Sequence, residues 1–257
     1  MLLGVPKHTD NLAVYGELGV YPLYIDALDR MLKYWHHIET FSENILLLDA
    51  YRCMQDLHSR GANTWLRFAL TIKNIYSHNN NDTLPPSPPV IKILKVKLKQ
   101  HYNKFWETSL MDDMKSKSKH GRKLRTYRKF KCSFGRETYL DISMNTNWRI
   151  HLSRFRVSAH RLAIEMGRRL GTELDKRLCP KCETHMIEDE WHFLFICPLY
   201  RQEREKLRQI ILGKSPLFDQ LNDDDQLCWL LSNQDDHVIL ALAEYVYTAM
   251  SIRFPKP

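Results

Sequence analysis

Apolar residues recur at three- and four-residue steps along most of the chain, a spacing that places them on one face of a helix. The first such segment begins at Leu23, the second runs from Ile45 to Leu57, and the third spans Trp65 to Tyr76. We expect these segments to pack as a helical bundle that forms an N-terminal lobe over residues 1–77. Residues 1–22 are interrupted by Pro and Gly, and we expect them to be irregular.

A stretch rich in Pro and Asn, residues 78–89, follows this lobe and is predicted to be a linker. Beyond it, apolar positions from Ile91 to Phe105 predict one long helix. Helix-like spacing returns over residues 137–170, where Gly171 stands at a C-cap position, and again near 201–212 and 237–252. The sequence therefore predicts a mostly α-helical fold, with a second, basic helical lobe over residues 90–257.

The positive charge of the chain is concentrated in one segment. From Val90 to Arg136 there are fifteen Lys and Arg against three acidic residues, an excess of +12 in a chain of net charge +8, which leaves about −4 elsewhere. Concentrated positive charge is where a polyanion docks, although a solvated loop that only improves solubility has the same composition. The predicted contacts to RNA or single-stranded DNA are Lys115, Lys117, Lys119, Arg122, Lys123, Arg125, Tyr127, Arg128, Lys129, Lys131, Arg168 and Arg169.

This binding would be largely independent of sequence and would weaken steeply with salt, because phosphate contacts release counterions. Tyr127 and Phe130 are the rings that could stack on bases within the basic segment.

The candidate chemistry of the chain lies in its clustered cysteines. Cys179 and Cys182 form a C-x-x-C pair, nine residues separate Cys182 from His192, and four more precede Cys197. Three thiolates and one imidazole suit tetrahedral Zn²⁺, and a full set of four protein ligands is typical of a structural rather than a catalytic site. We therefore predict a zinc module over residues 177–200, with His185 as an alternative nitrogen ligand.

Two other interpretations of the cysteines are weaker. A redox C-x-x-C would follow a strand in a βαβ unit, and no such unit is visible in the pattern. Cys53, Cys132 and Cys228 are scattered, and we expect them to be small buried hydrophobic residues.

The sequence contains no run of about 20 apolar residues, and its first residues lack the basic start and cleavage site of a secretory signal. We therefore expect an intracellular protein, cytoplasmic or nuclear, with no membrane partner and no disulfide framework.

Several segments resemble the C-terminal region of LINE-type (non-LTR) retrotransposon reverse transcriptases. The segment from Arg177 to Tyr200, RLCPKCETHMIEDEWHFLFICPLY, is similar to their C-terminal cysteine–histidine motif. The segment RVSAHRLAIEMGR at 156–168 resembles the sequence that leads into it. YGELGVYPL at 15–23 and LKYW at 32–35 resemble the region after the polymerase domain, and LAEYVYTAMSIR at 242–253 resembles the usual tail.

The resemblance implies a region that assists in handling template nucleic acid and that works with other parts of a reverse transcriptase polyprotein. Residues 62–135 match no segment of the family that we can quote. Polymerase chemistry needs paired carboxylates on a β-hairpin, and Asp112–Asp113 follow a helix-like pattern instead. The sequence thus predicts a non-catalytic nucleic-acid-binding protein with bound Zn²⁺. The alternative is a zinc-stabilised protein-interaction module, whose acidic segment 219–236 would meet a basic partner.

Overall fold

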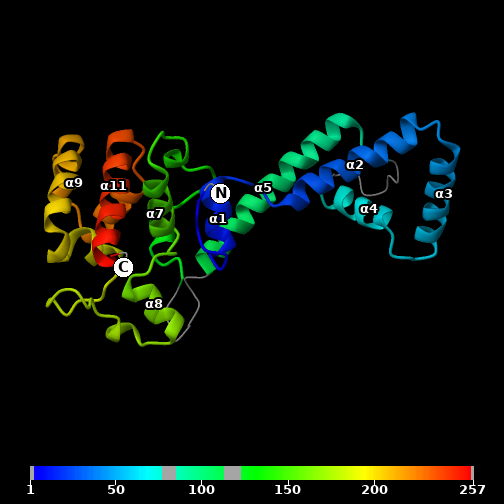
Figure 1. Cartoon of the computed structure of the whole chain (residues 1–257). Helices are drawn as coiled ribbons and strands as arrows, with labels where there is room; N and C mark the ends of the chain where they lie inside the picture. The colour runs from blue at the N-terminus through cyan, green and yellow to red at the C-terminus, as the bar shows by residue number, and fades with distance from the viewer. Residues whose placement is uncertain (1–2, 77–84, 113–122, 256–257) are drawn as a thin grey trace. The chain divides into compact units, whose positions relative to one another are not determined.

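The computed structural model describes residues 3–76, 85–112 and 123–255 of the 257-residue chain (Figure 1). Within these residues every regular element is a helix or a short helical turn, and the only β-type pairings are two isolated bridges, Leu18–Arg136 and Leu178–Ile187. The predicted mostly α-helical fold is confirmed. The chain divides into two compact units, a small unit of residues 21–105 and a large unit of residues 1–20 and 106–257.

The small unit is the predicted helical bundle with one addition. Its helices are α2 (Leu23–Phe41), α3 (Ile45–Ser59), α4 (Trp65–Tyr76) and the first part of α5 (Pro88–Asp112). Trp35 of α2 is completely buried, and its indole Nε1 donates a hydrogen bond to the hydroxyl of Tyr51 at 2.8 Å. Ile91 and Leu94 of α5 join this core, which explains why α5 belongs here up to Phe105.

The large unit is built around its last helix. Its elements are α1 (Asn11–Leu18), α6 (Tyr127–Phe130), η1 (Thr138–Leu140), α7 (Thr146–Arg156), α8 (Ala163–Leu170), η2 (Leu174–Lys176), η3 (His192–Ile196), η4 (Pro198–Tyr200), α9 (Arg201–Lys214), η5 (Phe218–Gln220), α10 (Asp223–Leu231) and α11 (Asp236–Arg253). Helix α11 packs against both α7 and α9 (Figure 1). The buried rings of Phe155, Phe193 and Tyr245 meet at this interface, and the Tyr245 hydroxyl donates to the Phe193 carbonyl at 2.6 Å.

The first segment of the chain is not irregular, as its Pro and Gly content suggested, because residues 11–18 form α1. Asp10 caps this helix by accepting a hydrogen bond from the Leu12 backbone N–H, and Gly19 ends it with a φ of 61°. A Cβ on Gly19 would lie only 2.3 Å from the backbone nitrogen of Arg136, so the adjacent segment at Arg136 requires glycine here.

The two compact units differ from the predicted lobes of residues 1–77 and 90–257. Residues 1–20 belong to the large unit, where the Trp106 indole Nε1 donates to the Leu12 carbonyl at 2.7 Å. Helix α5 begins at Pro88, inside the predicted linker of residues 78–89, because proline is tolerated in the first turn of a helix. Residues 78–84 of that linker lie outside the described part of the chain.

A buried ion cluster ties α1 to α7. The Arg156 side chain donates to both carboxylate oxygens of Glu17, at 2.9 and 3.1 Å, and also to Glu137 and to the Leu231 carbonyl. Glu17 is completely buried. Buried charges are tolerated only when paired, so these contacts hold the N-terminal segment against the core.

Two further expectations meet the structure here. Cys53 and Cys132 are exposed and Cys228 is half-buried, so the prediction that these cysteines are buried hydrophobic residues is wrong. None of the helices in the described residues combines the length and the apolar character that crossing a membrane requires.

Candidate metal centre

The first two cysteines of the cluster stand on a small hairpin. The Cys179 backbone N–H donates to the Met186 carbonyl at 2.9 Å, and the Glu188 N–H donates to the Arg177 carbonyl at the same distance. These bonds flank the Leu178–Ile187 bridge and close the loop that contains Cys182. His185 sits in the turn with a φ of 52°, a backbone conformation that histidine adopts more readily than most residues.

The other two members stand on a single wide helical turn. Residues 192–196 form the π-helix η3, in which the Cys197 N–H donates to the His192 carbonyl at 2.8 Å. This bond joins residues five apart, and π turns of this kind occur often at functional sites. Asp189 begins the turn, because its carboxylate accepts the His192 N–H at 2.9 Å. Pro198 then starts η4 and leads into α9.

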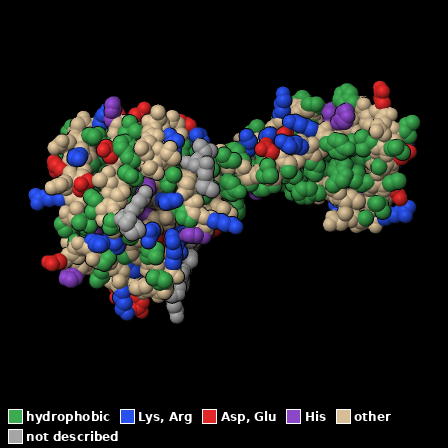
Figure 2. All heavy atoms as spheres, in the orientation of Figure 1, with side chains coloured by type: hydrophobic (Ala, Val, Ile, Leu, Met, Phe, Trp, Pro, Cys, Tyr) green, Lys and Arg blue, Asp and Glu red, His purple; other side chains and the backbone are tan. Residues whose placement is uncertain are grey.

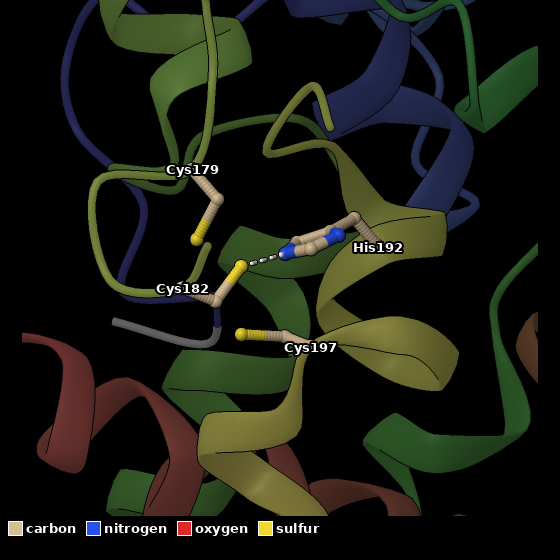
Figure 3. Close-up of side chains that lie close together, drawn as sticks. All are labelled: Cys179, Cys182, His192 and Cys197. Carbon is tan, nitrogen blue, oxygen red and sulfur yellow. Dashed lines mark hydrogen bonds between the residues drawn. The ribbon is translucent and has the colours of Figure 1, made fainter. Parts of the chain in front are cut away.

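Together the hairpin and the π turn bring the four predicted ligands to one point. One ligand atom from each of Cys179, Cys182, His192 and Cys197 lies within 4.8 Å of every other (Figure 3). The Cys182 Sγ and the His192 Nε2 are 3.4 Å apart. Cys179, His192 and Cys197 are buried and Cys182 is half-buried. The group could therefore hold a metal ion, and His185 is not a member of it.

Burial sets the protonation of these side chains. It raises the pKa of Cys179 to about 12 and also raises that of Cys197, because a thiolate is poorly solvated there. For Cys182 burial acts in the same direction, but hydrogen bonds with Thr184, Cys179 and Cys197 together outweigh it and lower the pKa. Burial also lowers the pKa of His192, which favours the neutral imidazole that a metal requires. A cation at this point would supply the charge that the buried thiolates need.

Glu188 connects the hairpin to two helices. Its carboxylate accepts hydrogen bonds from Arg253 at the end of α11, at 2.5 and 3.1 Å, and from the Ala163 N–H at the start of α8, at 2.7 Å. Its Oε1 also lies 3.9 Å from the Cys179 Sγ. Glu188 is 1% exposed, so its charge is satisfied by these partners alone.

Glu190, two residues after Glu188, holds the basic segment in place. It pairs with the guanidinium of Arg125, accepts the Thr126 hydroxyl at 3.0 Å and contacts the Nε2 of His160 at 2.9 Å. Burial would raise the pKa of Glu190, but Arg125 and His160 hold it well below its ordinary value. The second carboxylate on Arg125 is Glu165, at 3.0 Å.

Most of the predicted nucleic-acid contacts within the described residues have structural partners. Tyr127, Arg128 and Lys131 are buried, and Lys131 pairs with Glu137. The Tyr127 and Phe130 rings lie in the core, where they cannot stack on bases.

The remaining predicted nucleic-acid contacts differ in whether their charged groups are already paired. Lys123 donates to the His8 carbonyl at 2.9 Å, Lys129 pairs with Asp224 at 2.6 Å, and Arg168 pairs with Glu165 at 2.9 Å. Arg169 is exposed and makes no ion pair within the described residues. The last four, Lys115, Lys117, Lys119 and Arg122, lie outside the described residues.

Sequence reasoning missed a second group of arginines. The large unit has a cleft whose lining includes Arg154, Arg161 and Arg169, and of these only Arg169 was among the predicted contacts. A signal was available, because residues 149–169 contain six Arg and a single acidic residue, Glu165. The charge count did not reveal these arginines, because it combined this stretch with the acidic remainder of the chain.

Compared with known proteins, the chain matches no family model, no curated protein and no solved structure.

Proposed function

We propose that the chain is a zinc-stapled, non-catalytic module that binds single-stranded nucleic acid. The observation that carries the proposal is the convergence of three cysteines and one histidine within 4.8 Å of one another. Thiolate sulfur and imidazole nitrogen are the ligands that Zn²⁺ prefers, and four protein ligands complete its tetrahedral shell. A complete shell has no open position for a substrate, so the metal is structural.

Bound zinc would fasten the 177–188 hairpin to the turn that begins α9. Without the metal, the Leu178–Ile187 bridge and the ion pairs of Glu188 and Glu190 hold the hairpin. Zinc-finger peptides bind structural zinc with roughly 10–16 kcal/mol at neutral pH, which is comparable to the whole stability of a small domain. The metal therefore contributes to the order of every surface that the hairpin supports.

The nucleic-acid part of the proposal is supported by charge on the large unit. In Figure 2, several Lys and Arg side chains are visible on the face of this unit around α8. Arg161, just before α8, and Arg169, within α8, are exposed and make no ion pair within the described residues. A chain of net charge +8 attracts polyanions, and phosphate contacts require unpaired cations of this kind.

The resemblance of residues 156–200 to LINE-type reverse transcriptases supports a role for the chain within such an enzyme. We infer that the chain serves as the C-terminal portion of such an enzyme, inside the cell and beside other parts of the polyprotein. Asp112 is the last residue of α5, a helix, whereas polymerase carboxylates need a strand hairpin; Asp113 lies outside the described residues. Catalysis is accordingly assigned to other parts of the polyprotein.

One observation favours a second candidate, a protein-interaction module. The junction of α2 and α3 carries large apolar side chains in solvent, with Phe41 64%, Ile45 73% and Leu46 81% exposed. Figure 2 shows hydrophobic side chains gathered on this face of the small unit. Exposed apolar patches often mark protein contacts.

Metal analysis of the purified protein tests the zinc site. We expect one zinc per chain in the wild type and in Cys53→Ser, an exposed cysteine outside the cluster, and loss of that zinc in Cys182→Ser. Wild-type protein that is purified with zinc in the buffer and contains none would overturn the assignment.

Fluorescence anisotropy with a labelled single-stranded oligonucleotide, titrated at several salt concentrations, tests the binding. Affinity should fall linearly with salt on logarithmic axes. Absence of binding at low salt would remove the nucleic-acid function and leave the protein-interaction module.

A further inference from the structure

A cleft of about 730 Å³ opens in the large unit, and none of the four candidate metal ligands lines it. Its walls come from α7, α8 and α11, together with the loop that joins α7 to α8 and the segment just after α11. The volume falls within the roughly 300–1,000 Å³ that is usual for sites that enclose a small molecule. The cleft is therefore large enough to hold a nucleotide.

The charge of the cleft is positive and uncompensated. Arg154, Arg161 and Arg169 line it, and no Asp or Glu is among its lining residues. Arg154 is positioned by a hydrogen bond from its Nε to the Gly4 carbonyl at 2.8 Å. Arg161 and Arg169 have no acidic partner within the described residues, in contrast to Arg168, which pairs with Glu165. Guanidinium groups in a concave surface attract an anion and can bind a phosphate through two hydrogen bonds.

Aromatic rings form another part of the wall. The Arg161 guanidinium lies over the ring of Phe254, 4.9 Å from its centroid. Across the cleft lining, His151 and Tyr247 pack edge to face with their centroids 5.1 Å apart. These rings are half-buried. Arginine beside an accessible ring combines a phosphate contact with a flat surface for a base, which is the chemistry that single-strand-binding proteins use.

We propose that this cleft holds one unpaired nucleotide of a bound single strand. Arg161 and Arg169 contact its phosphates, and the base packs against Tyr247. This inference rests on the proposed function and adds where and how the strand is held. Bases within a duplex are stacked and paired, so the cleft selects single strands over duplexes.

The metal centre supports one wall of the cleft. Arg253 is fixed by Glu188, whose Oε1 lies 3.9 Å from the Cys179 Sγ. The Arg253 guanidinium also packs over Phe254, 4.6 Å from the ring centroid. The position of Phe254, and with it that of Arg161, therefore depends on the hairpin that carries Cys179.

The test compares the full zinc-loaded chain with charge-matched variants. Arg161→Ala/Arg169→Ala removes two positive charges from the cleft, and Arg201→Ala/Lys206→Ala removes two from α9, where neither residue lines the cleft. Binding is measured by anisotropy with a single-stranded oligonucleotide that carries one 2-aminopurine, whose fluorescence reports unstacking of that base. Circular dichroism and thermal melts verify that each variant is folded.

We expect the cleft variant to bind about tenfold more weakly, with a salt slope smaller by about 1.4, since each single-strand phosphate contact contributes about 0.7. The α9 control should lose less than about threefold, because its charges act only through screened long-range attraction. Tyr247→Ala should weaken binding about fivefold or more and abolish the 2-aminopurine signal, whereas Tyr247→Phe keeps the ring and should restore both.

The outcomes separate this inference from the proposed function. If the wild type binds the strand and the cleft variant binds it as well as the α9 control does, the assignment of the cleft is overturned and the proposed function stands. A wild type that binds no oligonucleotide overturns both. Free adenosine monophosphate should compete only at millimolar concentration; competition at micromolar concentration would make the cleft a mononucleotide site and overturn the assignment to a strand.

Discussion

The basic segment contains one residue whose role the sequence and the structure assign differently. Arg125 was predicted to contact nucleic acid, but its guanidinium lies between the buried carboxylates of Glu165 and Glu190. We predict that Arg125→Met destabilises the fold, because it leaves two buried charges with fewer partners. The side chains of Glu165 and Glu190 are 0% and 1% exposed, so water cannot replace the lost contacts.

The expected loss in free energy of unfolding is about 3 kcal/mol. Breaking a buried ion pair by removing one partner costs roughly 3–5 kcal/mol. The lower end applies, because the Arg125 side chain is 26% exposed and His160 and Arg168 keep their contacts with the two carboxylates. Burial would lower the pKa of Arg125, yet Glu190 and Glu165 raise it overall, which agrees with a favourable pairing.

Urea denaturation at neutral pH with saturating zinc measures this loss, with Glu190→Gln and the double variant completing a mutant cycle. The double variant should be less destabilised than the sum of the single variants by at least about 1 kcal/mol, since the two residues are in contact. Lys129→Met, at an exposed pair with Asp224, is the control and should change stability by less than about 1 kcal/mol. A loss below about 1 kcal/mol for Arg125→Met, together with a clear loss of oligonucleotide binding, would refute the structural role.

Three further predictions follow from the same contacts. Gly19→Ala should lower the free energy of unfolding by about 2 kcal/mol or more, because it adds a left-handed backbone penalty to a 2.3 Å clash. Gly61→Ala meets no atom within 4 Å and should cost only about 1 kcal/mol, and thermal melts compare the two variants. Glu188→Gln should weaken zinc binding about tenfold in a chelator competition, because Glu188 fixes the hairpin of Cys179. Glu190 has a lowered pKa, so its ionised form stabilises the fold above its unfolded pKa of about 4.3. The difference in stability between wild type and Glu190→Gln, measured with both proteins in EDTA, should therefore narrow as the pH falls below that value. A difference that stays constant with pH would contradict this prediction.

Local patterns in the sequence were enough to locate most of the helices and the four candidate metal ligands. Helices α2, α3, α4 and α11 follow the predicted apolar spacing. Asp235 caps α11 by accepting hydrogen bonds from the backbone N–H groups of His237 and Val238. The C-x-x-C pair with His192 and Cys197 converges as predicted. These features depend on residues close in sequence, where spacing alone determines which side chains share a face or a turn.

Helix α1 shows where the apolar pattern carries no information. Its buried residues are Ala13, Gly16 and Glu17, two small residues and an acid, so no apolar stripe marks it. Gly16 is small because Trp106 and Tyr127 occupy the space beside it, and Glu17 is buried because Arg156 pairs with it. Each of these partners is distant in the sequence.

The helices and the convergence of the four candidate metal ligands could thus be derived from the sequence by itself, whereas the tertiary structure decided which charges are available to a partner. Arg125, Arg128 and Arg161 are the same residue type, but the first is held by buried carboxylates, the second is buried, and the third is exposed and lines a cleft. The carboxylates that pair with Arg125, those of Glu165 and Glu190, lie 40 and 65 residues away along the chain. Pairing over such distances depends on the packing of whole helices, which no local spacing encodes.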